Sequence, residues 1–263
     1  MTRCLLTRIL EPAGLSVRVQ PIVDLSGVGA EPQLFGFECL TRGPEDSLFH
    51  SADLLFDYVR RKHAEPLVDR HCIRNALHAS RRVPSRSMIS LNVHASTIVR
   101  DSDFHSFLMD EVAKNQIPAS RIVIEIVEHG AAEDTERFNQ SIADLRSAGV
   151  QIALDDVGLG YSNYRMILEL RPEFFKVDAY IVKNCSRDRN RRAVLRSLVA
   201  LATDLNSQII AEGVETGEDL QVVQGFGIGL IQGYYFSPPL APEEIASSEL
   251  VAGLFGQLAE ERF

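Results

Sequence analysis

The sequence predicts an α/β fold, a (β/α)8-type barrel made mainly of parallel strands. Eight short runs that are largely apolar have the length and the residue types of buried strands. Helix-like segments lie between most of these runs, and each run leads directly to a polar side chain. Alternating strands and helices favour a parallel sheet covered by helices. The 263 residues are enough for one such barrel, so we expect a single domain over residues 1–263.

The eight strand-like runs each end at a residue that could bind a metal ion or a substrate. In chain order, the runs are 17–19 before Gln20, 34–37 before Glu38, 88–91 before Asn92, 121–124 before Glu125, 150–154 before Asp155, 173–175 before Lys176, 208–211 before Glu212 and 229–231 before Gln232. The site of such a barrel lies at the carboxyl ends of its strands. We therefore expect these eight side chains to surround one site.

The intervening segments predict helices and one reversed strand. Helical patterns occur at 53–62, 67–82, 135–147, 191–206 and 217–225, and a final one at 242–263 is expected to cover the barrel. The stretch 26–33, which is rich in glycine and contains Pro32, predicts a loop between the first two strands. A parallel connection needs about a dozen residues or more, so these two strands should be antiparallel.

Composition excludes several classes of protein. The net charge of -9 argues against direct binding of a nucleic-acid polymer, which usually needs a basic surface. The four cysteines, at 4, 39, 72 and 185, are scattered without zinc-type spacing, which indicates a reducing compartment. No apolar stretch approaches the roughly 20 residues that span a bilayer. We expect a cytoplasmic protein that does not bind a membrane.

The pair Asp155-Asp156 is the strongest local indication of a metal site. Two adjacent carboxylates at the end of a buried strand repel each other unless a cation lies between them. Neighbouring strand residues point to opposite faces, so both can reach one ion only if the backbone turns there, as Gly158 and Gly160 would permit. In the alternative interpretation Asp155 caps a loop and Asp156 is solvated. The ring of polar strand ends favours the metal site.

The predicted ligands suit two hard divalent ions. Oxygen donors without an organised cysteine or histidine cluster favour Mg²⁺ or Mn²⁺. One ion would be held by Glu38, Asn92, Glu125 and Asp155, and a second by Asp155 and Asp156, with Glu212 near it. Two such ions can activate a water molecule and stabilise phosphoryl charge, which predicts phosphodiester hydrolysis.

Lys176 has two interpretations. It could be a solvated surface lysine, or it could lie at a strand end among the carboxylates. Carboxylates favour the charged ammonium, so we expect it to supply positive charge and to position the water rather than to act as a free base.

Seven separated motifs occur in the order known from one family. They are Glu38-Cys39-Leu40-Thr41-Arg42, Asn92, Glu125-Ile126-Val127-Glu128, Asp155-Asp156-Val157-Gly158-Leu159-Gly160-Tyr161-Ser162, Lys176-Val177-Asp178, Glu212-Gly213-Val214-Glu215-Thr216 and Gln232-Gly233-Tyr234. Over residues 16–245 the chain resembles EAL domains, which are bacterial cyclic di-GMP phosphodiesterases of second-messenger signalling. The resemblance implies a modified TIM barrel that uses Mg²⁺ or Mn²⁺, two per site, to hydrolyse cyclic di-GMP to linear pGpG. It also implies a homodimer.

The resemblance also implies a role for each matching residue. The implied metal ligands are Glu38, Asn92, Glu125, Asp155 and Asp156. The implied catalytic residues are Lys176, Glu212 and Asp156. The residues that match family positions near the substrate are Gln20, Leu40, Arg42, Asp178, Glu215 and Gln232. Glu128 matches a residue that tethers the loop after the Asp pair. Arg42 is suited to phosphate or a guanine edge because its guanidinium is planar and multidentate.

Departures from the family pattern keep a second function open. Cys39 replaces the usual alanine, and its side chain should point away from that of Glu38. In the loop after the Asp pair, Val157 replaces an aromatic residue and Leu159 a hydroxyl residue. The alternative to an enzyme is a noncatalytic or weakly active cyclic di-GMP receptor that signals through a regulatory protein, and more remotely a hydrolase of another phosphodiester. Retention of every ligand favours the phosphodiesterase.

Overall fold

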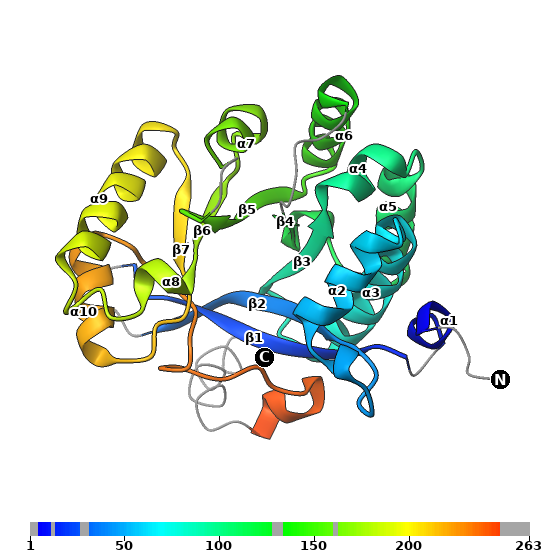
Figure 1. The fold of residues 1–263 in the computed structure, drawn as a ribbon, viewed down its shortest axis with the longest axis horizontal. Helices are drawn as coiled ribbons and strands as arrows, with labels where there is room; N and C mark the ends of the chain where they lie inside the picture. Colours follow the sequence, from blue (N-terminus) through cyan, green and yellow to red (C-terminus); the bar gives the residue numbers. More distant parts are fainter. Residues whose placement is uncertain (1–4, 12–13, 27–31, 128–133, 160–162, 248–263) are drawn as a thin grey trace.

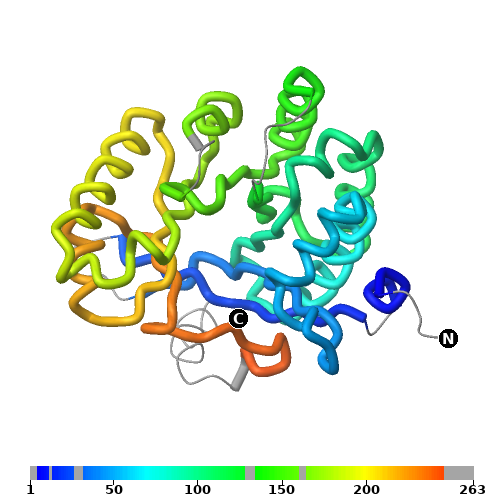
Figure 2. Tube along the Cα trace, in the orientation of Figure 1, coloured from blue at the N-terminus to red at the C-terminus, as the bar shows by residue number. Residues whose placement is uncertain are grey.

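Eight strands close into a barrel in which they follow one another in sequence order. The structure is a computed structural model and describes residues 5–11, 14–26, 32–127, 134–159 and 163–247. Figure 1 shows the ring of strands with helices outside it, and Figure 2 lets the chain be followed around the ring from β1 in blue to the orange carboxyl-terminal part. The predicted α/β barrel is confirmed.

The element bounds are as follows. The strands are β1 Ser16–Asp24, β2 Gln33–Arg42, β3 Met88–His94, β4 Ile122–Val127, β5 Gln151–Val157, β6 Phe174–Val177, β7 Gln208–Ala211 and β8 Leu230–Ile231. The α-helices are α1 Leu5–Ile9, α2 Ala52–Arg61, α3 Glu65–Ala79, α4 Ala95–Arg100, α5 Phe104–Lys114, α6 Thr135–Ser147, α7 Asn163–Leu170, α8 Ala179–Val182, α9 Arg189–Asp204 and α10 Gly217–Gly225. The 3-10 helices are η1 Leu48–His50, η2 Ser80–Arg82, η3 Ala119–Arg121 and η4 Pro242–Ser247.

The first strand runs against the direction of all the others. β1 is antiparallel to β2, as predicted, and it is also antiparallel to β8, whereas β2 to β8 pair in parallel. The expectation that Gln20 ends a strand is wrong, because β1 continues to Asp24. Gln20 lies in the middle of β1 opposite Glu38. β2 likewise continues past Glu38 to Arg42, so Glu38 does not end its strand either.

Two predicted helices, 135–147 and 217–225, coincide with α6 and α10. α9 begins earlier than predicted because Asp188 caps it, accepting hydrogen bonds from the backbone N–H groups of Asn190 and Arg191. At the carboxyl end, Pro242–Ser247 form a 3-10 helix that contacts β1, and the rest of the predicted helix lies outside the described residues. No helix in the described ranges is long and apolar enough to cross a membrane.

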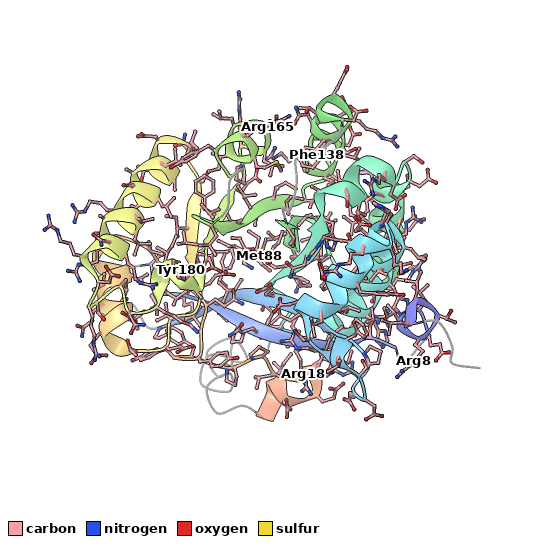
Figure 3. The ribbon with its side chains drawn as sticks, viewed as in Figure 1. Arg8, Arg18, Met88, Phe138, Arg165 and Tyr180 are labelled. Carbon is pink, nitrogen blue, oxygen red and sulfur yellow. The ribbon has the colours of Figure 1, made fainter. Side chains whose placement is uncertain are left out.

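An apolar floor fills the barrel beneath the predicted site. A buried cluster joins Ile22, Val123, Ala153, Phe174, Ile210 and Leu230, with Phe35 and Met88 packed against it. Figure 3 shows Met88 within the ring of strands and Phe138 on α6. Val123, Ala153 and Phe174 each precede a polar strand-end residue by two positions, so each lies on the same interior face. Because of this spacing, the polar side chains form the next layer inside the barrel, directly above the apolar floor.

Candidate active site

The layer above the floor contains one polar residue from each strand or from the position directly after it. These residues are Gln20, Glu38, Asn92, Glu125, Asp155, Lys176, Glu212 and Gln232. Glu38, Glu125 and Lys176 are buried, with exposed fractions of 5%, 0% and 1%. Buried charges are costly unless they are paired, so the interactions within this polar ring determine its chemistry.

Lys176 lies at the centre of the polar ring. Its Nζ atom is 2.7 Å from Oε1 of Glu212, 2.8 Å from Oε2 of Glu125, 3.2 Å from Oδ1 of Asp155 and 3.3 Å from Oε1 of Glu38. Burial lowers the pKa of Lys176, but the four carboxylates outweigh it and hold the pKa well above its usual value. Lys176 is therefore a buried lysine, not a solvated one, and its carboxylate partners favour its charged form, which disfavours a role as a free base.

Two side-chain amides, those of Asn92 and Gln232, hold Glu38 in place, and a third, that of Gln20, contacts Gln232. Asn92 donates to Oε1 of Glu38 at 2.9 Å, and Gln232 donates to Oε2 at 2.6 Å. Gln232 also reaches Gln20 at 3.0 Å, and Gln20 donates to the carbonyl of Ser237 at 3.0 Å. Burial raises the pKa of Glu38, but the charge of Lys176 and these hydrogen bonds lower it overall. Glu38 is thus an ionised carboxylate of restricted orientation.

A bulge in β5 brings both members of the Asp pair toward one site. The register between β5 and β6 shifts between Leu154 and Val157, and Asp156 has a positive φ of 53°. The predicted turn is present, but it is a bulge inside the strand rather than a turn after its end. Gly158 follows with φ 101°, a backbone conformation that residues with a Cβ rarely adopt, so this position favours glycine.

The carboxylates fit a divalent cation. Asp155, Asp156 and Glu212 can each offer an oxygen such that the three atoms lie within 4.8 Å of one another. Burial, with the charge of Asp155, raises the pKa of Asp156 to about 7 and that of Glu212 to about 8. Oε1 of Glu125 is buried and has no hydrogen-bond partner among the described residues, and burial raises the pKa of this side chain well above its usual value. A cation would relieve both the repulsion and the unpaired oxygen.

Without divalent metal, stability should fall as the pH rises from about 4 to about 8. The pKa values of about 7 for Asp156 and about 8 for Glu212 exceed the ordinary values of 3.8 and 4.5, so the folded state binds more protons than the unfolded state in this range. Raising the pH removes those protons and leaves repelling carboxylates. Thermal denaturation in chelator should show the fall, and Mg²⁺ or Mn²⁺ should stabilise more at the higher pH. If Mg²⁺ or Mn²⁺ stabilised the protein equally at the low and at the high end of this pH range, repulsion between deprotonated carboxylates would not explain the fall in stability.

A cavity of about 500 Å³ opens beside the polar ring. Its lining includes Glu38, Asp155 and Asp156 on the metal side, and Leu40 and Arg42 from the end of β2.

The other four predicted substrate residues do not line this cavity. Gln20 and Gln232 are buried within the polar ring. Asp178 caps α8 by accepting from the backbone N–H of Tyr180 at 2.6 Å, and Glu215 pairs with Lys183 at 2.7 Å. Glu128, predicted to tether the loop, lies outside the described residues.

Four polar or aromatic residues that the sequence interpretation missed also line the cavity. Asp53, Phe56 and Arg60 come from α2, and His94 from the end of β3. The helical residues recur at intervals of three and four, which is a signal that they share one helix face. The sequence alone does not show which surface this face covers. As expected, Cys39 packs outside the polar ring, with its sulfur 3.6 Å from Oγ of Ser80.

Comparison with known proteins finds similarity over nearly the whole barrel. A family model described as EAL domain matches residues 5–239. A cyclic di-GMP phosphodiesterase of Pseudomonas aeruginosa is 29% identical over 241 residues, 88% of this chain and 39% of that protein. The blue light- and temperature-regulated antirepressor BluF of Escherichia coli is 28% identical over 150 residues, 57% of this chain and 37% of that protein. The chain thus spans less than two fifths of either relative.

A solved structure shares the fold. BlrP1 of Klebsiella pneumoniae, in a complex with manganese and cyclic di-GMP, superimposes with a TM-score of 0.77 at 26% identity. The superposition covers 89% of this chain and 58% of BlrP1.

Proposed function

Because the chain belongs to the EAL domain family, we propose that it is a metal-dependent phosphodiesterase that hydrolyses cyclic di-GMP to linear pGpG. The observation that carries this proposal is the polar ring, in which Lys176 lies within 3.3 Å of four carboxylates at the carboxyl end of the barrel. A relative that is named a cyclic di-GMP phosphodiesterase supports the substrate class.

The proposed metal ligands are Glu38, Asn92, Glu125, Asp155 and Asp156. Bound Mg²⁺ or Mn²⁺ ions would supply an activated water and neutralise charge on the phosphoryl group. Asn92 uses its amide nitrogen for Glu38, so its amide oxygen is the atom suited to a cation. The manganese in the BlrP1 complex supports this class of ion.

Lys176 and Glu212 are the proposed catalytic residues, together with Asp156. Lys176 stays protonated, so it orients the attacking water and stabilises developing negative charge. Glu212 lies 2.7 Å from Lys176 and is less buried than Glu38 or Glu125, which suits it to accept a proton at the water side of the polar ring.

The substrate would lie across the mouth of the polar ring. Leu40 and Arg42 line the cavity on one side, and Arg42 would contact a phosphate or a base edge. Asp178 and Glu215, beyond β6 and β7, are the proposed contacts on the other side. Gln20 and Gln232 are proposed to act near the substrate through Glu38, whose orientation their hydrogen bonds determine.

The deciding experiment incubates purified protein with cyclic di-GMP and Mg²⁺ or Mn²⁺, with and without chelator. We expect pGpG to form only when the metal is available, because the carboxylates alone supply no activated water. Chromatography separates substrate from product. No conversion, or conversion that the chelator leaves unchanged, would contradict the proposed enzyme.

The second candidate is a cyclic di-GMP receptor of little or no activity, acting through a protein partner. It is favoured by the similarity to BluF, which is named an antirepressor, and by Val157 and Leu159 in the loop after the Asp pair. Binding of cyclic di-GMP without product in the same incubation would support it. Sedimentation of the same sample would test the proposed homodimer.

A further inference from the structure

Cationic residues concentrate in one short segment after β6, although the chain as a whole is acidic. Between residues 183 and 196, Asp188 is the sole acidic residue, whereas the whole chain has a net charge of -9. The segment starts after α8 and continues along α9. Its six cationic residues, which we call the basic cluster, are Lys183, Arg187, Arg189, Arg191, Arg192 and Arg196.

The stability of α9 does not explain the basic cluster. Three of the arginines, Arg189, Arg191 and Arg192, stand at the start of α9, where the first turn contains no acidic residue. Positive charge at the amino end of a helix opposes the helix dipole. Arg187 and Arg189 are exposed, and neither side chain forms an ion pair or a hydrogen bond with another described residue. The charge of these two residues is therefore available to a ligand.

The basic cluster borders the polar ring at the carboxyl ends of β6 and β7. Cε of Lys183 is 3.2 Å from the position that a Cβ of Gly213 would occupy, and Gly213 directly follows Glu212 of the polar ring. The guanidinium of Arg191 lies 4.6 Å from the ring centroid of Tyr180 on α8. Figure 3 shows Tyr180 between the ring of strands and α9. The cluster thus extends outward from the mouth of the polar ring.

An anionic ligand meets repulsion as it approaches this protein. The cyclic dinucleotide carries two negatively charged phosphodiester groups. Bound divalent ions would offset the carboxylates of the polar ring, but the chain outside the ring remains acidic. Positive charge beside a binding site raises the local concentration of an anionic ligand and its rate of encounter with the site.

We propose that the basic cluster attracts the anionic dinucleotide to the mouth of the polar ring before it binds. The inference rests on the proposed function, because it takes cyclic di-GMP as the ligand. Arg187 and Arg189 contribute most, since their charges are uncompensated, whereas Lys183 forms an ion pair with Glu215. Charge that acts from a distance speeds association and leaves the chemical step unchanged.

The test compares the double variant Arg187→Gln with Arg189→Gln to a matched control, Arg81→Gln with Arg82→Gln. Arg81 and Arg82 are exposed and precede the amino end of β3, away from the polar ring, and their replacement removes the same charge. Stopped flow mixes each protein with Mn²⁺ and a fluorescent analogue of cyclic di-GMP, which gives the association rate kon and the dissociation rate koff. The Debye length falls from about 20 Å to about 4 Å between the two NaCl concentrations used, about 20 mM and about 500 mM.

At low salt, the Arg187→Gln, Arg189→Gln variant should lose about three- to tenfold in kon, with little change in koff or kcat. At high salt the difference should disappear, because salt screens exposed charges. The Arg81→Gln, Arg82→Gln control should keep the wild-type kon at both concentrations. Arg187→Lys with Arg189→Lys retains the charge without the planar fork, so it should also keep the wild-type kon.

The outcomes separate the inference from the proposed function. If the wild type binds cyclic di-GMP and the glutamine variant keeps its kon at low salt, the inference is wrong while the proposed function stands. A rise in koff that persists at high salt would indicate direct contact and would also overturn the inference. A change in sedimentation of the glutamine variant would overturn it too, since the cluster would then join copies of the chain. A wild type that neither binds nor hydrolyses cyclic di-GMP would overturn both.

Discussion

Replacing Asp155 with asparagine is expected to lower kcat for cyclic di-GMP hydrolysis by about 10³-fold, a loss of several kcal/mol of transition-state stabilisation. Asp155 belongs to the group of oxygens that could hold a cation, and it lies 3.2 Å from Lys176. Asparagine has nearly the same shape but no charge. The variant should therefore lose the divalent ion while the barrel remains intact.

The control for Asp155→Asn is Asp204→Asn. Asp204 is exposed at the end of α9 and should tolerate the change with wild-type kcat. Calorimetric titration with Mn²⁺ should show weakened binding in Asp155→Asn only. If this variant kept wild-type turnover, Asp155 would not be a metal ligand of the reaction and the assignment of the whole site would need revision.

Lys176→Met is expected to lower the free energy of unfolding by about 3–5 kcal/mol in metal-free protein and to abolish turnover. The reason is that Lys176 is the shared cationic partner of Glu38, Glu125, Asp155 and Glu212, and its removal leaves their charges uncompensated in a buried layer. Urea unfolding near pH 8 in chelator measures the stability. Adding Mg²⁺ or Mn²⁺ should recover part of it.

Lys114→Met is the matched control for Lys176→Met. Lys114 also forms an ion pair, at 2.9 Å with Glu111, but its side chain is 65% exposed. Such a surface pair contributes about 0–1 kcal/mol, so this variant should unfold near the wild-type urea concentration. Similar stability losses in the two lysine variants would show that the centre of the polar ring is not electrostatically coupled as the distances indicate.

The polar ring could be predicted from the sequence because each of its members closes an apolar run. In a parallel strand, the end of the run determines the height of the side chain in the barrel, as it does for Glu125 and Lys176. Gln20 follows the same pattern, but its strand ends later than the apolar run predicts. Pro21 follows it directly, and β1 nevertheless continues through this proline to Asp24.

Other features depend on contacts that periodicity does not encode. The left-handed backbone of Asp156 accompanies the register shift against β6. The sequence predicts a turn near the Asp pair, but it does not show that this turn is a bulge inside β5. Likewise, Phe56 and Arg60 look like ordinary helix-surface residues until α2 packs beside β2. The part of the cavity wall that α2 forms therefore could not be predicted from motifs, whereas the residues of the polar ring could.

The reversed first strand has a consequence for the order in which the site can form during synthesis. β1 pairs with β8 at Val23 with Ile231 and at Asp24 with Leu230, and a separate bridge joins Val19 to Leu240, which follows β8 in the chain. Across this seam, Gln232 bonds to Gln20 and Glu38, which lie 212 and 194 residues earlier. A nascent chain therefore cannot orient Glu38 until its last strand has left the ribosome. Cation binding should consequently mark the completed barrel, and products that stop before β8 should lack it even where most strands have paired.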